Sequence, residues 1–494
     1  MSSPGNSDEP LADEADRHQS EGLRLASIGK LPEALEHFQT AIRLRPDNPV
    51  WHFNHGLAWQ HLGQLPNAIA AYRNAVRLKP DFFDAWNNLS AALKGTGDLV
   101  GSIAAGQQAV GICPNAGGAH LNLGNALKAA GDWAGAESSY RRGLILDPAN
   151  PKLRLNLGNT LREAGRLTEA IAVLRQAVAK SPDFPEAHRD LAFTLLISGD
   201  LPAGWLENEW RWQTEDMVRK RRAFNAPAWC GEDLTGRNIL VYTEQGFGDA
   251  IQFVRYVKLL SRRAGWVIVE CQLALHRLFE TLDGVGKLVV RGEPLPHFDL
   301  HAPLLSLPRM FGTTLESIPN EVPYLAAPSG TNVELPPATG QQLRVGVVWA
   351  GNPDHINDRN RSLALPLLQP LLHRRGIRLC SLQVGERSAE LRRTSGMGEI
   401  FDLSPGLRDF AATAAAIRQL DLVISVDTVV AHLAGALGTP VWLLLPFAPD
   451  WRWLLGRSDS PWYPTMRLFR QSKPGDWPGV IQQVCSELRL LAGE

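Results

Sequence analysis

Short apolar runs mark the second half of the chain, where they alternate with stretches of helical periodicity. The runs expected to be strands are NILVY, GWVIVECQ, KLVVR, VPYL, LRVGVVWAG, IRLCSLQ, DLVISVD and PVWLLLP. A polar stretch rich in proline and glycine, AAPSGTNVELPPATGQQ, divides them into two groups. Continuous apolar strands with intervening helices are typical of parallel sheets covered on both faces. The pattern predicts two α/β domains, over residues 237–327 and 342–494, joined by a linker over 328–341.

Two such domains suggest a pair of Rossmann-like folds that face each other across a cleft. Ligands of parallel α/β sheets bind at the carboxyl ends of the strands. We therefore expect the functional residues in that cleft, where strands run into helices.

The first two hundred residues follow a different pattern, because prolines, glycines and small residues return every 34 positions. Prolines stand at Pro46, Pro80, Pro114, Pro148 and Pro182. Glycines stand at Gly29, Gly63, Gly97, Gly131, Gly165 and Gly199. Small residues recur at Ala34, Ala68, Ser102, Ala136 and Ala170, and again at Gly22, Gly56, Ser90, Gly124, Gly158 and Ala192.

This spacing resembles the tetratricopeptide repeat, a helix–turn–helix unit of 34 residues. The glycine is expected to end helix A, the small residues to lie where helices A and B cross, and the proline to follow helix B. We predict an all-α solenoid over residues 17–215, with five repeats and a degenerate capping unit near LPAGWLENEWRW.

An asparagine column runs through the repeats, two residues before each small residue of helix A. Its members are Asn54, Asn88, Asn122 and Asn156, with Asp190 in the fifth repeat. An asparagine side chain offers a donor and an acceptor, so it can pair with a peptide backbone of any sequence. The column resembles that of the peptide groove in O-GlcNAc transferases, although asparagine is also common at polar helix positions. We expect a protein or peptide in this groove.

Composition and charge narrow the function classes. The chain has 494 residues and a formal net charge of −1, so it has no global field that would attract nucleic acid or an acidic membrane. The basic run RKRR at 219–222 is expected as a solvated helix face or a domain joint, within a linker over 216–236. No apolar run reaches the ~18 residues needed to span a bilayer.

The cysteines and the first residues indicate the compartment. Five cysteines lie far apart and form no C-x-x-C pair, which argues against zinc and suits a reducing environment. The start, MSSPGNSDEPLADEADRHQS, is polar and acidic and lacks the features of a signal peptide. We predict a disordered leader over residues 1–16 and a cytoplasmic protein.

One predicted strand runs into a glycine-rich turn. After NILVY come Gly246, Gly248 and Asp249, and then an amphipathic helix. Glycine permits a close approach of substrate to the backbone, and a helix start presents free N–H groups. The turn does not carry G-x-G-x-x-G, because position 251 is Ile251, so a dinucleotide fingerprint is not supported. Asp249 is expected either to act as a general base or to cap the helix.

A second strand end, in the carboxyl-terminal domain, carries DTVVAH at 427–432. The strand is expected to end at Asp427 and Thr428, and the following helix carries His432. The helix N-terminus, the hydroxyl of Thr428 and the imidazole of His432 together would form a site for a diphosphate.

The two motifs together resemble the bacterial heptosyltransferase-like glycosyltransferases, glycosyltransferase family 9, over residues 237–470. This resemblance implies the GT-B architecture of two facing Rossmann-like domains. The Gly-Asp of that family matches Gly248 and Asp249, which makes Asp249 the expected catalytic base. Its D-T-G-x-x-H motif matches residues 427–432, with Val429 in place of the glycine. That departure removes a close backbone approach at the diphosphate.

A third element, VWAGNPDHINDRNRSL at 348–363, carries positively charged arginines. The family has a lysine in this region, and Arg359 or Arg361 would replace it, because arginine forks onto phosphate oxygens. Alternatively, these arginines pair with Asp354 or Asp358. The stretch SLQVGE places Gln383 at another strand end, where the family holds the ribose and base of the nucleotide.

The resemblance thus implies a glycosyltransferase that moves a sugar from a nucleotide-diphosphate donor to a hydroxyl of a protein or glycan, with inversion. The catalytic half has no D-x-D pair, so we expect no metal and no cofactor, with the nucleotide sugar as co-substrate. Its expected donor-binding residues are Gly246, Gly248, Arg359, Arg361, Gln383, Asp427, Thr428 and His432.

Two alternatives remain open. One is a scaffold whose repeats recruit proteins and whose second half is inactive; Val429 favours it, and the presence of both Asp249 and His432 opposes it. The other is a nucleotide-sugar epimerase, which shares the two-domain architecture but whose carboxylate and histidine pattern has no match here.

Overall fold

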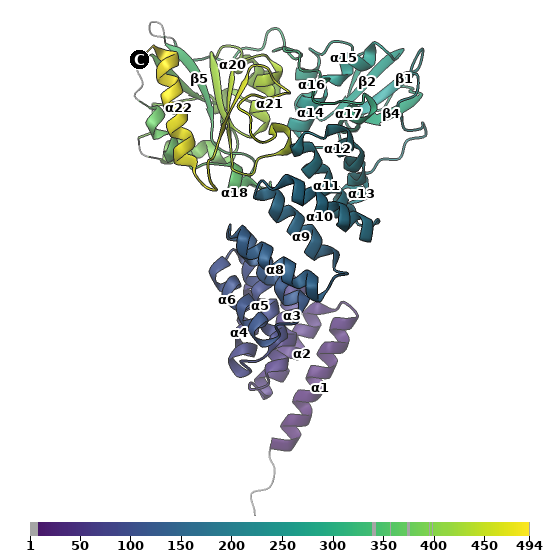
Figure 1. Ribbon diagram of the computed structural model, residues 1–494, viewed down its shortest axis with the longest axis vertical. Helices are drawn as coiled ribbons and strands as arrows, with labels where there is room; N and C mark the ends of the chain where they lie inside the picture. Colours follow the sequence, from purple (N-terminus) through teal and green to yellow (C-terminus); the bar gives the residue numbers. More distant parts are fainter. Residues whose placement is uncertain are drawn as a thin grey trace, which may run out of the picture. The chain divides into compact units, whose positions relative to one another are not determined.

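The computed structural model describes residues 8–337, 342–355, 357–372, 376–394, 396–397 and 399–493. It divides into two compact units, Met1–Phe184 and Pro185–Glu494, which are described separately below (Figure 1). In the described part of the chain, no helix combines the length and apolar character needed to cross a membrane.

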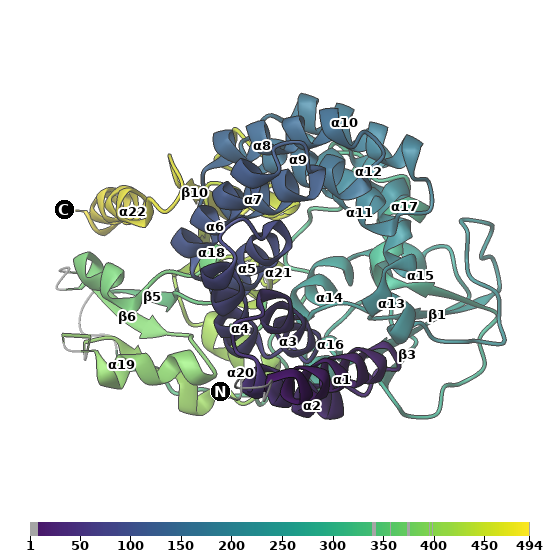
Figure 2. The ribbon, with the colours of Figure 1, turned by 90° about the horizontal axis from the view of Figure 1, so that it is seen from below.

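The first unit consists of antiparallel helix pairs that follow a curved path (Figure 2). Its helices are α1 (Asp8–Ser27), α2 (Leu31–Leu44), α3 (Pro49–His61), α4 (Leu65–Leu78), α5 (Phe83–Thr96), α6 (Leu99–Ile112), α7 (Gly117–Ala129), α8 (Trp133–Leu146), α9 (Pro151–Glu163) and α10 (Leu167–Lys180). This is the predicted tetratricopeptide-repeat solenoid.

Glycine and small residues act in the solenoid as predicted. Gly97 follows α5 with a φ of +86°, a left-handed conformation that favours glycine, and the glycines 34 residues away share it. Gly56 lies at the crossing of α3 and α4, where an added Cβ would come within 2.6 Å of the ring of Tyr72. Ala68 on the opposing helix is fully buried. The helices can therefore approach closely at every repeat.

The amino-terminal boundary differs from the prediction. Helix α1 begins at Asp8, so residues 8–16 are helical and do not belong to a disordered leader. Its buried Ala15 packs with Ala41 and Trp51, which gives the acidic sequence an apolar contact that its composition did not reveal. Residues 1–7 lie outside the described residues.

The helix pair that carries Asp190 follows the five pairs of the first unit and belongs to the second unit, although the sequence placed it in one solenoid with the others. It contains α11 (Pro185–Ser198) and α12 (Leu201–Asn208), followed by a 3-10 helix, η1 (Glu209–Gln213). Trp205 of α12 is 2% exposed, and its Nε1 donates to the carbonyl of Thr313 at 3.1 Å. Its ring meets that of Trp451 edge to face at 5.3 Å. The last helices are thus packed into the α/β part.

The predicted linker over 216–236 is partly structured. Helix α13 (Glu215–Lys220) ends within the basic run, and its Arg219 pairs with exposed Glu215. Arg222 pairs with Glu270, which is fully buried in the first sheet, and its guanidinium lies 4.7 Å from the ring centroid of Phe224. The basic run therefore forms a joint, one of the two interpretations given above.

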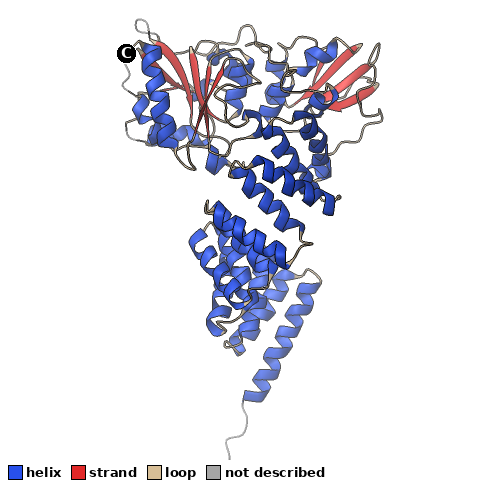
Figure 3. Ribbon diagram, in the orientation of Figure 1, coloured by secondary structure: helices blue, strands red, loops and turns tan. Residues whose placement is uncertain are grey.

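The first sheet is parallel, with four strands in the order β3-β2-β1-β4 (Figure 3). β2 and β3 lie on one side of β1, and β4 lies on the other, so the strand order reverses between β1 and β4. Its elements are β1 (Asn238–Tyr242), α14 (Phe247–Phe253), α15 (Tyr256–Ser261), β2 (Trp266–Cys271), α16 (Leu273–Phe279), β3 (Lys287–Val290), β4 (Leu300–Pro303), η2 (Leu304–Ser306) and α17 (Leu307–Met310).

The second sheet is also parallel, with six strands in the order β10-β9-β8-β5-β6-β7. The order reverses between β5 and β8. Its strands are β5 (Leu343–Val348), β6 (Ile377–Ser381), β7 (Phe401–Asp402), β8 (Leu422–Val426), β9 (Val441–Leu445) and β10 (Met466–Arg470). Its helices are α18 (Asp358–Arg361), η3 (Leu365–Leu371), η4 (Glu386–Ala389), α19 (Glu390–Arg393), η5 (Ser404–Gly406), α20 (Phe410–Ile417), α21 (Val429–Ala436), η6 (Trp451–Trp453) and α22 (Trp477–Ala492).

Strand assignments failed where a strand is short or half-exposed. VPYL is not a strand, and the fourth strand of the first sheet is β4, whose four residues alternate between buried and half-buried. β10 was also missed, because MRLFR alternates charged and apolar residues at the sheet edge. Continuous apolar runs identify central strands, whereas edge strands need only one apolar face.

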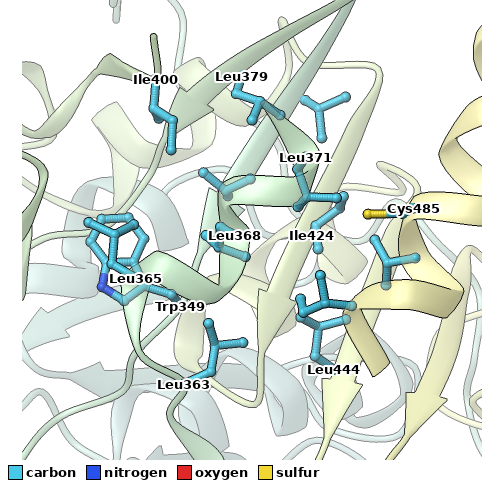
Figure 4. Close-up of a cluster of buried hydrophobic side chains, with 14 of the residues drawn as sticks. Trp349, Leu363, Leu365, Leu368, Leu371, Leu379, Ile400, Ile424, Leu444 and Cys485 are labelled. Carbon is cyan, nitrogen blue, oxygen red and sulfur yellow. The ribbon is translucent and has the colours of Figure 1, made fainter. Parts of the chain in front are cut away.

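One face of the second sheet packs on a large apolar core (Figure 4). Trp349, directly after β5, is fully buried in this core, and its indole Nε1 donates to Glu390 at 2.9 Å. Cys485 of α22 lies at its edge.

Candidate functional site

The two motifs singled out in the sequence lie together in the second unit. Helix α14 follows β1, helix α21 follows β8, and the two helices pack against each other between the sheets (Figure 1). Gly248 faces His432, where an added Cβ would come within 3.1 Å of the imidazole Cδ2. Both strands border a point of order reversal, which is where parallel α/β sheets bind ligands.

Asp249 caps its own helix and also carries an ion pair. Its Oδ2 accepts from the backbone N–H of the N-cap residue Gly246 at 3.1 Å, the contact that a carboxylate at N3 makes in one half of a capping box. Its Oδ1 accepts from Nη2 of Arg452. Burial raises the pKa of Asp249, and the charge of Arg452 opposes this rise. The carboxylate thus stabilises the start of the helix from the N3 position, although the N-cap residue is Gly246 and not Asp249, and the role of general base stays a prediction.

Arg452 is the central cation of the site, and the sequence analysis missed it. It lies on η6 and is 9% exposed, with its guanidinium 4.3 Å from the ring centroid of Trp451. Its Nη1 donates to Asp450 at 2.9 Å and its Nε to Gln252 at 2.5 Å. One signal in the sequence pointed to it: DWRW follows the predicted strand PVWLLLP, hence another strand end.

His432 is buried as a neutral imidazole. Its Nδ1 lies 3.0 Å from the hydroxyl of Tyr463, and its ring stacks on Trp453 with 5.4 Å between centroids. Burial lowers the pKa of His432 well below its ordinary value, and the charges of Arg452 and Arg361 act in the same direction. The side chain thus offers hydrogen bonds but no positive charge.

Asp427 and Thr428 lie at the end of β8, as predicted. Burial raises the pKa of Asp427 to about 6, with Asp450 acting in the same direction. Thr428 is the N-cap residue of α21, and its hydroxyl lies 3.2 Å from that of Ser425. At neutral pH, Asp427 therefore holds its proton more readily than an ordinary aspartate does.

The structure separates the two candidate arginines. Arg361 is half-buried, and its Nε lies 3.5 Å from Oδ1 of Asp358, the ion pair considered as an alternative above. Its charge lowers the pKa values of both Asp427 and His432, which places it beside them. Arg359, on the same helix, is exposed and has no such effect. Arg361 is thus the arginine that the fold brings to this site.

Gln383 is buried and bound to the backbone. Its Oε1 accepts from the N–H groups of Trp349 and Ala350 at 3.2 and 3.0 Å. Its Nε2 donates to the carbonyls of Ala350 and Val384 at 3.1 and 3.3 Å. These bonds hold Trp349 and Ala350, the first residues after β5. They engage the same side-chain amide of Gln383 that was predicted to bind the nucleotide.

A second buried network, also missed, joins η1 to the end of β1. Glu244 follows β1, and its Oε1 accepts from Nη2 of Arg211 at 3.1 Å and from the N–H of Leu305 at 3.2 Å. Arg211 also donates to Glu209 at 2.7 Å and to Ser306 at 2.8 Å. Burial raises the pKa of Glu244 to about 7, and Arg211 opposes the rise.

Glu244→Gln is expected to flatten the pH dependence of stability. The pKa of Glu244 rises from its ordinary 4.5 to about 7, so the folded state binds the extra proton. The contribution of Glu244 to the stability of the wild type therefore falls as pH rises from 4.5 to about 7. Glutamine keeps an acceptor for Arg211 and does not titrate. Denaturant titrations at pH values on either side of this window would measure the difference; an equal loss in both proteins would contradict it.

The asparagine column lies half-buried on the A helices, and part of it links neighbouring repeats. Nδ2 of Asn122 donates to Oδ1 of Asn87 at 2.8 Å, and Nδ2 of Asn156 donates to Oδ1 of Asn125 at 2.7 Å. Asn88 and Asn54 occupy the equivalent positions on α5 and α3. An amide has two N–H donors and an acceptor, so each link leaves capacity for a further partner.

Comparisons with known proteins concern mainly the repeats. A tetratricopeptide-repeat model matches residues 121–202, and a second TPR-repeat model matches 22–63 and 61–97. MamA from Desulfovibrio magneticus RS-1 is 19% identical, with a TM-score of 0.34 over 35% of this chain and 97% of that chain. The TPR protein TTC0263 from Thermus thermophilus is 23% identical, with a TM-score of 0.31 over 37% and 99%.

Protein FlbA of Caulobacter vibrioides is a curated relative, 28% identical over 328 residues. The match covers 60% of this chain and 54% of FlbA, so the chain spans about half the length of that relative. The first unit holds only residues 1–184 of 494, so a match of this extent also includes part of the second unit. Residues 22–97 and 121–202 of this chain are tetratricopeptide repeats.

Proposed function

We propose that the second unit is a GT-B glycosyltransferase, which transfers a sugar with inversion from a nucleotide-diphosphate donor to a hydroxyl acceptor. One observation carries this proposal: the segments that follow β1, β8 and β9 bring Asp249, His432 and Arg452 into one cluster. Two parallel sheets with a carboxylate from one and cations from the other are what such a transfer needs.

Each group has a role in the transfer. Asp249 takes the proton of the acceptor hydroxyl as its oxygen forms a bond to the anomeric carbon. The bond from that carbon to the diphosphate breaks, and the diphosphate departs with the electron pair. Arg361 and Arg452, together with the N-terminus of α21, stabilise the charge that develops on it. Neutral His432 contributes a hydrogen bond.

The raised pKa of Asp249 suits the base role, because a carboxyl whose pKa lies closer to neutrality takes a proton more readily. Asp427 supports donor binding in another way. With a pKa of about 6, it is neutralised at small cost when a diphosphate arrives beside it. Donor affinity is therefore expected to increase as pH falls from about 7 towards 6.

A thermal-shift screen of nucleotide-diphosphate sugars tests the proposal directly, since a ligand of the folded state raises its stability. The sugar nucleotide found is then titrated against Arg361→Ala by calorimetry. A charge-assisted contact contributes about 1.5–3 kcal/mol, so a loss of tenfold or more is expected. Arg359→Ala, on the same short helix but exposed, is the matched control and should bind normally. Equal affinities in all three proteins would remove Arg361 from the site.

We further propose that the solenoid presents a polypeptide acceptor. Replacing Asn88, Asn122 and Asn156 together by Ala should slow transfer to protein and spare hydrolysis of the donor. Each lost hydrogen bond is worth about 0.5–1.5 kcal/mol. The control is Asn87→Ala, which removes the partner of Asn122 in the preceding repeat and keeps the column intact. Equal transfer to total cell protein by wild type and triple variant would refute the proposal.

The second candidate is a scaffold with an inactive α/β unit. It is favoured by one observation, that both carboxylate oxygens of Asp249 already have partners in the fold. A scaffold predicts no stabilisation by any nucleotide sugar and unchanged function on loss of Arg361. The thermal-shift screen therefore separates the two candidates.

A further inference from the structure

The ion pair between Arg452 and Asp249 joins residues 203 positions apart, from the two sheets of the second unit. The three nitrogens of the Arg452 guanidinium each donate to a different side chain. Its Nε donates to Gln252, its Nη1 to Asp450, and its Nη2 to Asp249. The stack on Trp451 holds the guanidinium plane. Two of the three hydrogen bonds and the stack are therefore independent of Asp249.

This pair lies among other charged groups. Asp427 and Asp450 act electrostatically on the site, as do Arg361 and Arg255, so that three aspartates face three arginines. The amide of Gln252 is fully buried, and its Nε2 has no hydrogen-bond partner among the described residues. A buried donor without a partner costs free energy and is satisfied when an acceptor arrives.

We propose that the contact between Arg452 and Asp249 is a latch, which an anionic diphosphate opens by taking over Nη2 of Arg452. This inference rests on the proposed function, and it names how the site is regulated. The oxygens of a phosphate group compete well for a guanidinium, because arginine binds them with the same fork geometry as a carboxylate. Nη2 changes its partner while Nε and Nη1 keep theirs, so the side chain stays anchored.

The latch orders the reaction. Before the donor binds, Arg452 occupies Oδ1 of Asp249, and its charge opposes the rise in the pKa of this carboxyl that burial causes. After the donor binds, the same charge faces the diphosphate, and Asp249 keeps only its bond to the N–H of Gly246. The base thus becomes competent only when a sugar is present to be transferred. The acceptor is deprotonated second, and the enzyme follows a donor-first order.

Calorimetric titration with inorganic pyrophosphate tests the latch without any need for turnover. Asp249→Asn removes the competitor for Nη2, so it should bind pyrophosphate about fivefold or more tightly than the wild type. Arg452→Gln should bind it about tenfold or more weakly, the loss of one charge-assisted contact. Asp409→Asn is the matched control: Asp409 also caps a helix and pairs with an arginine of the other sheet, Arg277, at 2.7 Å. It should bind as the wild type does.

If the ion pair does not open, Asp249→Asn is not expected to increase the affinity for pyrophosphate. If Asp249 merely positions Arg452, its loss would weaken pyrophosphate binding or leave it unchanged, and either result overturns the latch. Unchanged binding by Arg452→Gln overturns it as well. If Asp249→Asn does not fold, Asp249→Ser carries the same expectation, because its hydroxyl can also accept from the N–H of Gly246.

The latch and the proposed function fail in different ways. Tighter pyrophosphate binding by Asp249→Asn in a protein that transfers no sugar would sustain the latch and reject the glycosyltransferase. Sugar transfer by the wild type, with equal pyrophosphate affinity in both proteins, would sustain the enzyme and reject the latch. Absence of pyrophosphate binding in the wild type and in both aspartate variants would also reject the latch.

Discussion

Asp249→Asn is expected to slow sugar transfer by a factor of about 10²–10⁴, the usual contribution of a general base. The substitution removes the proton acceptor of the reaction. It keeps the fold, because the amide oxygen of asparagine still accepts from the N–H of Gly246 and completes the helix cap. Transfer is measured under saturating donor, and donor binding is measured separately by calorimetry.

The control for this result is Asp409→Asn, which removes an ion pair between the same two sheets outside the site. It should retain full activity. Normal turnover by Asp249→Asn would refute the base assignment. A lower melting temperature with normal turnover would leave helix capping as the sole role of Asp249.

Trp205→Ala is expected to lower the free energy of unfolding of the second unit by about 3–5 kcal/mol, the cost of truncating a buried tryptophan. The indole of Trp205 is 2% exposed and meets Trp451 at 5.3 Å and Phe253 at 6.2 Å. Its removal leaves a cavity beneath the segment that carries Arg452 and leaves the carbonyl of Thr313 without its donor.

Trp205→Phe is a milder change, because a smaller aromatic ring stays in the site while the bond to Thr313 and part of the indole volume are lost. Its cost should be smaller than that of the alanine variant. Urea denaturation followed by tryptophan fluorescence measures both. A loss below about 1 kcal/mol for Trp205→Ala would show that α12 is not part of the cooperative unit.

The repeats could be predicted from sequence because the residues that determine their packing contact partners close by in the sequence. Gly56 and Tyr72 are 16 residues apart, and their contact recurs with a fixed period. A pattern of this kind needs no knowledge of the rest of the chain. The central strands were equally evident, since β8 is apolar at every position except Ser425.

The centre of the site was harder to predict, because its contacts join distant segments. Asp249 was found through the turn that carries it, but its partner Arg452 is 203 residues away. The link between Glu244 and Arg211 spans 33 residues and joins two different kinds of fold. For Gln383, the sequence showed the position at a strand end but not the hydrogen bonds of its amide to the backbone of Trp349 and Ala350.

The division of the chain at Phe184, within the repeats and not after them, has a consequence for how such proteins can vary. Helices α11 and α12 are an integral part of the α/β unit, held by Trp205 and Arg211. All preceding repeats form a separate array with its own internal contacts. Whole 34-residue units can therefore be gained or lost ahead of Phe184 without disturbing the residues around Asp249. The length of the arm and the chemistry of the site are free to evolve independently.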